Sequence, residues 1–182
     1  MSPDERWARL FADLEMAFEA EERRRRDSEV ADRTRRERAG VTLAARLTAH
    51  RGQPLQARLL GGLRVEGQLI DVGRDWCAIT AGASRALVVP LPAIASVTGL
   101  THRGDFAPRR FALGYALRGI SRDRAPALVT DVLGTGFQGT IDVVGKDFLD
   151  LAEHPIDEAR RSRNVRNVRT IPFACITSIQ TG

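Results

Sequence analysis

Apolar and polar residues alternate with a period of two along much of the chain after residue 53. Leu55, Ala57 and Leu59 each stand between polar or turn residues, and Val65, Gly67 and Leu69 alternate with polar residues in the same way. This period predicts β-strands that have one buried face and one face in water. Further strands are expected at residues 76–80, 86–91, 93–97, 137–143, 148–153, 169–173 and 175–179.

One of these stretches occurs twice. Residues 67–79 read GQLIDVGRDWCAI, and residues 139–151, 72 positions later, read GTIDVVGKDFLDL. PLPAIASV at 90–97 also matches PFACITSI at 172–179, after an insertion of ten residues in the second copy. The first spacing relates two further pairs, Pro54 with Pro126 and Gly62 with Gly134. These colinear matches predict an internal duplication of a unit of about sixty residues.

Helical periodicity dominates the first forty residues. Ser2-Pro3-Asp4-Glu5 is typical of a helix start, with Ser2 as the capping residue. The residues that form an apolar stripe at three- and four-residue spacings are Trp7, Leu10, Phe11, Leu14, Ala17 and Phe18. From residue 19 to 38 acidic and basic side chains recur four apart, which predicts that the helix continues as a solvated helix. Shorter helices are expected near residues 43–47 and 113–120, one before each repeat.

The sequence therefore predicts an α+β protein of four segments. These are an amphipathic, then charged helical arm at 1–40, a first small β-barrel at 41–100, a basic linker and helix at 101–125, and a second small β-barrel at 126–182. Each barrel is expected to contain five antiparallel strands and to follow a short helix.

The units resemble the Sm and Sm-like family of small β-barrels, here twice in tandem. The resemblance rests on Leu55, Leu59, Gly62, Gly67, Leu69, Ile94 and Val97 in the first unit, and on Leu133, Gly139, Ile141, Ile176 and Ile179 in the second. It implies assembly through edge strands and binding of single-stranded RNA. The PRC-type barrel is a second resemblance, because GTIDVVGKD followed by IPFACI is similar to it as well.

The residues of the Sm-family RNA pocket have no counterpart in this chain. Gly73 and Cys77 stand where the family has an aspartate and an asparagine, and Gly145 and Leu149 stand there in the second unit. The resemblance therefore carries no binding residue over to this sequence.

Composition narrows the class of protein. An apolar content of 43% allows a real core, and no apolar run reaches the roughly eighteen residues of a membrane span. Without a leader pattern at the N-terminus, we expect a cytoplasmic protein. Cys77 and Cys175 lie in predicted strands and are expected to be buried free thiols rather than a disulfide.

Motifs for catalysis, metal binding or cofactor binding are missing from the sequence. His50, His102 and His154 show no metal-ligand spacing, and we expect surface histidines. Asp75 and Asp147 recur in both repeats, but an aspartate that bonds the backbone of its own turn explains their recurrence. We therefore expect no catalytic residue, no metal, no cofactor and no enzyme activity.

Net charge is +5 and comes from 27 arginines and a single lysine, Lys146. Two basic regions are candidate binding surfaces. The linker and second helix carry Arg103, Arg109, Arg110, Arg118, Arg122 and Arg124, interleaved with Phe106, Phe111 and Tyr115. The insertion of the second repeat carries Arg160, Arg161, Arg163, Asn164, Arg166, Asn167 and Arg169, near Asp157 and Glu158.

Two functions are compatible with these patterns. The first is a non-catalytic protein that binds RNA or another nucleic acid, with Arg160–Arg169, Arg109 and Arg110 as contacts, because arginines reach phosphates and asparagines reach bases. The second is a protein–protein adaptor or self-assembling scaffold that acts through the apolar stripe of Trp7, Leu10, Phe11, Leu14 and Phe18. Both include homo-oligomer formation, and neither includes a membrane.

Overall fold

The chain divides into two compact units, Met1–Val41 and Thr42–Gly182. The structure is a computed structural model that describes residues 3–80, 82, 85–100, 106–155 and 160–181, and the side chains of residues 3–13 and 31 are outside this description.

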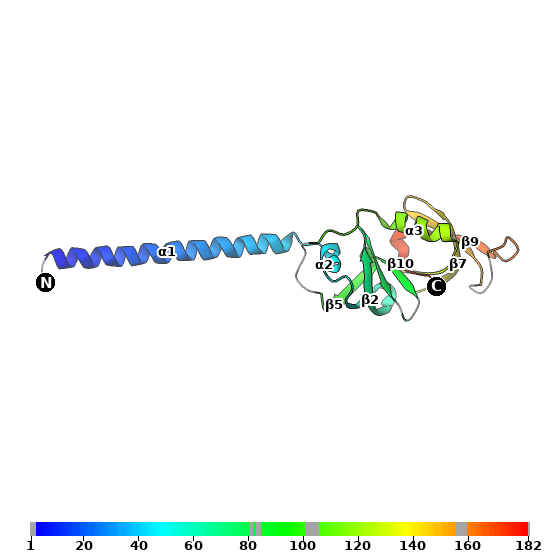
Figure 1. Cartoon of the computed structure of the whole chain (residues 1–182), viewed down its shortest axis with the longest axis horizontal. Coiled ribbons are helices and arrows are strands. Elements are labelled where there is room, and N and C mark those ends of the chain that lie inside the picture. Colours follow the sequence, from blue (N-terminus) through cyan, green and yellow to red (C-terminus); the bar gives the residue numbers. More distant parts are fainter. Residues whose placement is uncertain (1–2, 81, 83–84, 101–105, 156–159, 182) are drawn as a thin grey trace. The chain divides into compact units, whose positions relative to one another are not determined.

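The first unit is the helix α1, Pro3–Ala39, which confirms that the helix continues through the charged segment (Figure 1). Ion pairs one turn apart line it, among them Arg26 to Glu22 at 2.6 Å. Leu14 and Phe18 of the predicted stripe are 55% and 67% exposed. The side chains of the other large stripe residues, Trp7, Leu10 and Phe11, and the capping residue Ser2 lie outside the described residues. Among the described helices, none is long and apolar enough to cross a membrane.

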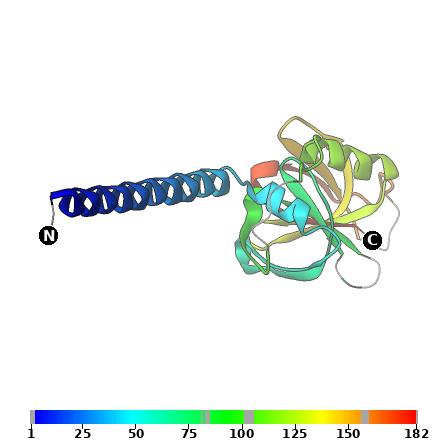
Figure 2. The ribbon, with the colours of Figure 1, turned by 60° about the vertical axis from the view of Figure 1, so that its left-hand side comes forward.

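In the second unit, the described residues form two α-helices and ten strands. The helices are α2 (Leu43–Ala49) and α3 (Leu113–Asp123). The strands are β1 (Pro54–Leu59), β2 (Arg64–Val72), β3 (Trp76–Thr80), β4 (Ala86–Pro90), β5 (Ile94–Thr98), β6 (Pro126–Asp131), β7 (Gly136–Val144), β8 (Phe148–Glu153), β9 (Asn167–Pro172) and β10 (Ile176–Thr181). Nine of these strands lie where the sequence predicts strands, whereas β6 lies outside the predicted ranges. A short helix precedes each set of five (Figure 2).

The prediction of two closed five-stranded barrels is wrong. All ten strands form one open antiparallel sheet in the order β5-β1-β2-β3-β4-β10-β6-β7-β8-β9. A closed first barrel would need the second edge of β4 to pair with β5, but β4 pairs with β3 and with β10 of the other half, and β10 also pairs with β6. β10 therefore joins the two halves, and β5 and β9 are the outer strands.

The two halves repeat each other register by register. Pro54 pairs with Gln68 in the first half, and Pro126 pairs with Thr140 in the second, 72 residues later in both strands. The irregularity between Leu69 and Asp71 recurs between Ile141 and Val143. The duplication inferred from sequence thus holds at the level of strand pairing.

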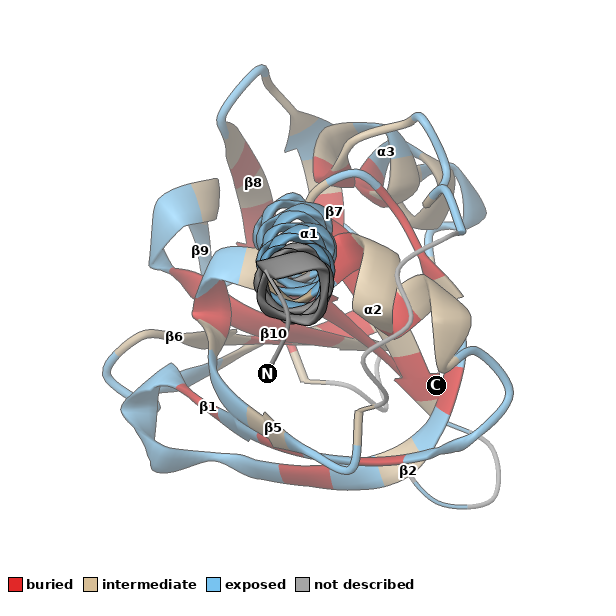
Figure 3. Ribbon diagram, turned by 90° about the vertical axis from the view of Figure 1, so that its left-hand side faces the viewer, coloured by how far each residue is buried: buried red, intermediate tan, exposed pale blue. Residues whose placement is uncertain are grey.

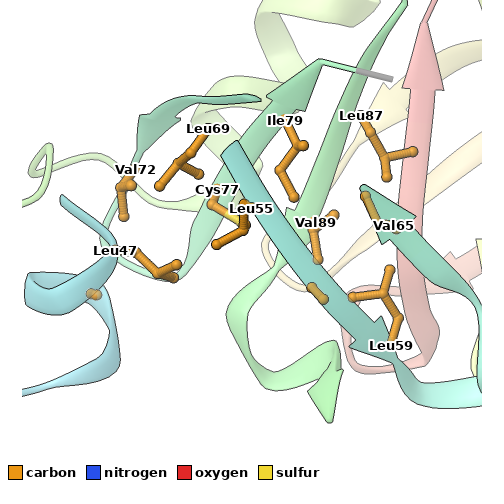
Figure 4. Packing of buried hydrophobic residues seen from close by; sticks show 12 residues of the cluster. Leu47, Leu55, Leu59, Val65, Leu69, Val72, Cys77, Ile79, Leu87 and Val89 are labelled. Carbon is orange, nitrogen blue, oxygen red and sulfur yellow. The ribbon is translucent and has the colours of Figure 1, made fainter. Parts of the chain in front are cut away.

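Each half has its own buried cluster. Figure 3 shows in red the buried residues along the strands. In the cluster of the first half, Leu47 of α2, Leu55 of β1 and Leu69 of β2 point into one core, which Figure 4 shows from close by. Trp76 and Val88 come from the first half but pack in the cluster of the second half. The two cores therefore meet along β3 and β4.

Glycine is required where β2 and β7 pass close to their neighbours. A Cβ atom on Gly67 would lie 1.7 Å from the backbone oxygen of Thr80, and one on Gly139 would lie 2.1 Å from that of Ala152. The glycine repeated in each half is thus explained by close backbone approach.

The two cysteines differ in their environments. Both are free, but Cys77 is buried whereas Cys175 is exposed, so the expectation of burial is wrong for Cys175. Cys175 lies in a short 3-10 turn, Phe173–Cys175, instead of a strand. Burial raises the pKa of the Cys77 thiol from 9.0 to about 12.

A thiol-reactive dye at pH 8 is expected to modify Cys175 rapidly and Cys77 only after unfolding, because the thiolate is the reactive form. Above pH 9 the unfolded thiol ionises while the folded Cys77 keeps its proton up to about pH 12. The Cys77 contribution to the free energy of unfolding should therefore fall by up to about 1.4 kcal/mol per pH unit in this window. Denaturation of the wild type and of Cys77→Ala at pH 8 and pH 10 measures this difference. An equal pH dependence in both proteins would contradict the assignment.

Candidate nucleic-acid interface

The insertion of the second repeat carries Arg160, which is not free to meet a ligand. Its Nε donates to Oδ1 of Asp142 at 2.7 Å, and a second guanidinium nitrogen donates to Oδ2. This two-point hydrogen bond raises the pKa of the Arg160 guanidinium above its ordinary value. A phosphate at this position would have to compete with a carboxylate that is already bound in the favoured geometry.

Arg169 and Arg109 have carboxylate partners as well. Arg169 binds Glu153 through Nε, and its guanidinium carbon lies 4.2 Å from the ring centre of Phe137, as in a cation–π contact. Arg109 binds Asp71, whose other carboxylate oxygen lies 3.5 Å from Arg51. Three of the predicted nucleic-acid contacts therefore have structural partners instead.

Of the remaining predicted contacts, Arg166 lines one open hollow together with Arg169 and Phe137. Arg110, Arg161, Arg163 and Arg166 are exposed and form no ion pair within the described residues. The backbone N–H of Asn164 donates to Arg161 in a turn, at 2.8 Å, while Asn167 begins β9 opposite Glu153. Arg103, Asp157 and Glu158 lie outside the described residues.

A second basic region forms around the start of α3. Asp75 Oδ1 accepts the backbone N–H of Leu113 at 2.7 Å and so caps the helix from the β2–β3 turn. Trp76 Nε1 donates to the backbone oxygen of Phe111 at 3.3 Å. These two bonds fix the segment that enters α3 against the first half of the sheet. The expectation that Asp75 bonds its own turn is therefore wrong.

Three aromatic rings follow one another at this point. The centres of Trp76 and Phe111 are 5.6 Å apart, and those of Phe111 and Tyr115 are 5.0 Å apart. Trp76 is buried, while Tyr115, at the outer end of the row, is 56% exposed. A buried ring thus supports a ring that offers one face to solvent.

Two basic residues line the same hollow as the exposed ring. An open hollow of about 590 Å³ is lined by Phe111, Tyr115, Arg118 and Lys146, together with Ala112, Gly114 and Gly145. The main chain of Arg74 lies near this hollow, because its backbone N–H donates to the backbone oxygen of Phe111 at 3.2 Å. Within the described part of the chain, Arg74, Arg118 and Lys146 are exposed and form no ion pair. We call the surface of Phe111, Tyr115, Arg118 and Lys146 the α3 surface.

Sequence reasoning found part of the α3 surface and missed the rest. It included Phe111, Tyr115 and Arg118 in the basic linker and helix, because aromatic and basic residues alternate there. Lys146 comes from the turn between β7 and β8, and only the packing of α3 against β7 brings it to the hollow. Its sequence position gave no sign of this neighbourhood.

His154 is buried, contrary to the expectation of a surface histidine. Nδ1 lies 2.8 Å from the backbone oxygen of Pro155, which can only accept, so Nδ1 carries a proton. Nε2 lies 2.8 Å from Thr140 Oγ1, whose hydroxyl can donate to it. Both ring nitrogens thus have partners, and His154 holds β7 and β8 together. His50 Nε2 bonds the backbone oxygen of Pro54 at 2.7 Å, and His102 lies outside the described residues.

Metal-binding groups of three or more histidine, cysteine or acidic side chains do not occur among the described residues. Comparisons of the chain with protein-family models, curated proteins and solved structures show no match in any of the three. Functional inference therefore depends on the chemistry of the surfaces described above.

Proposed function

We propose that this protein binds single-stranded nucleic acid, with RNA as the first candidate, through the α3 surface and without catalysis. The observation that carries the proposal is the exposed ring of Tyr115, which lines one hollow with Arg118 and Lys146, two cations that form no ion pair in the described residues. A base can stack on an aromatic face while cations beside the ring hold the phosphates. The sheet-bearing unit, residues 42–182, has 18 basic and 12 acidic side chains, which favours a polyanion over long range.

The contrast with the ion-paired Arg160, Arg169 and Arg109 supports this choice of surface, and the exposed ring of Tyr115 distinguishes it from the unpaired Arg161, Arg163 and Arg166 of the insertion. The Arg160, Arg169 and Arg109 charges are balanced by Asp142, Glu153 and Asp71. Those around Tyr115 are balanced by no described carboxylate. Cations without a protein partner gain more from a phosphate, because no existing bond has to break.

Tyr115→Ala is the test of the stacking role. We expect the affinity for a fluorescent single-stranded RNA, measured by anisotropy at low salt, to fall by about 5- to 150-fold, since stacking is worth about 1–3 kcal/mol per base. Tyr115→Phe is the matched control, because it keeps the ring and should bind almost as the wild type does. Arg118→Ala should lower the slope of log affinity against log salt by about one.

Two results would contradict the proposal. One is equal affinity of Tyr115→Ala and the wild type, with far-UV circular dichroism unchanged. The other is binding that does not weaken as salt rises. A parallel titration with single-stranded DNA of the same sequence shows whether the 2′-hydroxyl contributes.

The adaptor function stays the competing proposal. It is supported by Leu14 and Phe18, which are exposed four residues apart on α1. An adaptor of this kind would be unaffected by Tyr115→Ala, so the same variant separates the two functions.

A further inference from the structure

The pairing of β4 with β10 shows how one half of this protein attaches to the other. Ala86, Leu87 and Val88 of β4 pair with Thr181, Gln180 and Ile179 of β10, in antiparallel order. At this junction Leu87, Val88 and Ile179 are buried. The internal duplication therefore includes an interface between two units.

Each half contains a copy of both partners in this interface. Pro90 and Pro172 occupy the same register position, since they pair with Trp76 and Phe148. β9 is thus the counterpart of β4. Val97 pairs with Ala57 and Ile179 pairs with Val129, 72 residues after Ala57, so β5 is the counterpart of β10.

These two counterparts are the outer strands of the sheet. In the described residues β5 pairs with β1 alone and β9 pairs with β8 alone. The positions that are buried at the internal junction are open here. Val168 is 55% exposed and Thr170 is also exposed, whereas their counterparts Ala86 and Val88 are partly and fully buried.

Other residues at the internal junction show the same difference. Leu113 of α3 is 4% exposed where the two halves meet, while Leu43, in the corresponding place on α2, is 38% exposed. Trp76 is buried in the cluster of the other half, while its counterpart Phe148 is partly exposed. The two outer edges of the sheet, β5 and β9, thus expose counterparts of the two surfaces that are buried at the β4–β10 junction in the middle of the sheet.

The backbone of β9 is oriented to accept another strand. Phe173 N–H donates to Asp147, so by antiparallel alternation Ile171 and Arg169 direct their backbone groups to β8. Val168 and Thr170 then direct their N–H and C=O groups outwards. Pro172, which lacks an N–H, lies beyond the paired stretch, just as Pro90 does in the internal junction.

β5 has few of the features that keep an edge strand unpaired: its irregularity at Ala95 recurs at Thr177 of β10, which pairs with β4 all the same. Its residues, Ile94–Thr98, include no charged side chain and no proline. Natural edge strands are usually protected by lysine, proline, a bulge or a cover, because an open edge can pair with another strand. An uncharged edge of this kind is suited to a partner strand.

We propose that β9 of one chain pairs with β5 of a second copy in antiparallel order, repeating the internal β4–β10 junction. Thr170 then lies opposite Val97, Arg169 opposite Thr98, and Val168 opposite Gly99. The contact is head-to-tail, so a pair of copies keeps one free β5 edge, on the first copy, and one free β9 edge, on the second, for further copies. The partner is a second copy of this chain, since its register comes from the chain's own duplicated junction.

Thr170→Pro in the full chain tests the pairing. Proline removes the outward N–H without removing a bond to β8, and its ring blocks an approaching strand. Thr170→Val is the matched control, because both variants lose the Thr170 hydroxyl bond to Asp150 but only proline loses the amide. We expect the wild type and Thr170→Val to self-associate in sedimentation velocity over a range of protein concentrations. The association constant of Thr170→Pro should be lower by about tenfold or more.

The register itself is tested at Thr98, which faces Arg169 across the proposed contact. Thr98→Glu should strengthen self-association and Thr98→Arg should weaken it, because directly opposite side chains interact across antiparallel strands. A wild type that stays monomeric at high concentration would overturn the proposal. Equal association of Thr170→Pro and Thr170→Val would also overturn it and would assign self-association to α1. RNA affinity through Tyr115 is a separate property, which failure of the strand contact does not decide.

Discussion

Replacing Gly67 with alanine is expected to prevent the sheet from forming at ordinary temperature. The added Cβ atom would lie 1.7 Å from the backbone oxygen of Thr80 and 3.0 Å from a methyl carbon of Ile79. Backbone cannot move out of the way without breaking the pairing of β2 with β3, where Leu69 is opposite Ile79. We expect the free energy of unfolding to fall by about 4 kcal/mol or more, which is a large share of the stability of a domain of this size.

Gly119→Ala is the matched control for that substitution. Gly119 lies inside α3, and an added Cβ would meet nothing within 4 Å. Alanine is favoured over glycine in a helix by about 0.5–1 kcal/mol, so this variant should be slightly more stable than the wild type. Urea denaturation followed by far-UV circular dichroism measures both. A Gly67→Ala protein that unfolds at the wild-type urea concentration would show that β2 and β3 do not approach as described.

Ile179→Ala should destabilise both halves of the sheet at once. Ile179 is fully buried on β10, opposite Val88 of β4 on one side and Val129 of β6 on the other. Removing three carbons from a buried isoleucine costs about 2–5 kcal/mol. Because β10 pairs with strands of both halves, we expect one cooperative unfolding transition that shifts as a whole, rather than unfolding of the second half alone.

Fluorescence and circular dichroism together test this coupling. Trp76 is buried between the first and second halves and reports on their junction, while circular dichroism reports on all strands. Ile70→Ala, at an exposed position on β2, is the control and should change the free energy of unfolding by less than about 1 kcal/mol. Two separated transitions in Ile179→Ala would be evidence for independently stable halves.

The positions of most strands could be predicted from the sequence, because they depend on the alternation of apolar and polar residues over a few positions. The alternation around Leu55 and Val65 places the strands there correctly, and the duplication predicts matching registers in both halves. Whether the sheet closes into barrels could not be predicted, because a strand shows the same period-two alternation whichever strand it pairs with. One signal was present: Ala86–Val89 of β4 is uniformly apolar, as in a strand covered on both sides, whereas its counterpart on β9 contains Arg169 and Thr170.

The candidate site was predicted only in part, because the sequence shows the residues of one segment but not their neighbours from other strands. An arginine-rich segment shows positive charge in a sequence, but its acidic partners come from other strands, as Asp142 does for Arg160. The sequence of the arginine-rich segment alone therefore could not show that carboxylates on other strands neutralise some of its arginines. The aromatic row that supports Tyr115 likewise depends on Trp76, which is far away along the chain.

The shared strand β10 has a consequence for how the protein is made. β4 is complete at Pro90, but its pairing partner is residues 176–181. During synthesis the apolar edge of β4 thus stays without its native partner while α3 and five further strands are added. Contacts between distant segments form slowly, and unpaired apolar edges aggregate. A nascent chain that stalls before residue 176 would expose the unpaired edge of β4. We therefore expect least aggregation when translation through the second half is rapid.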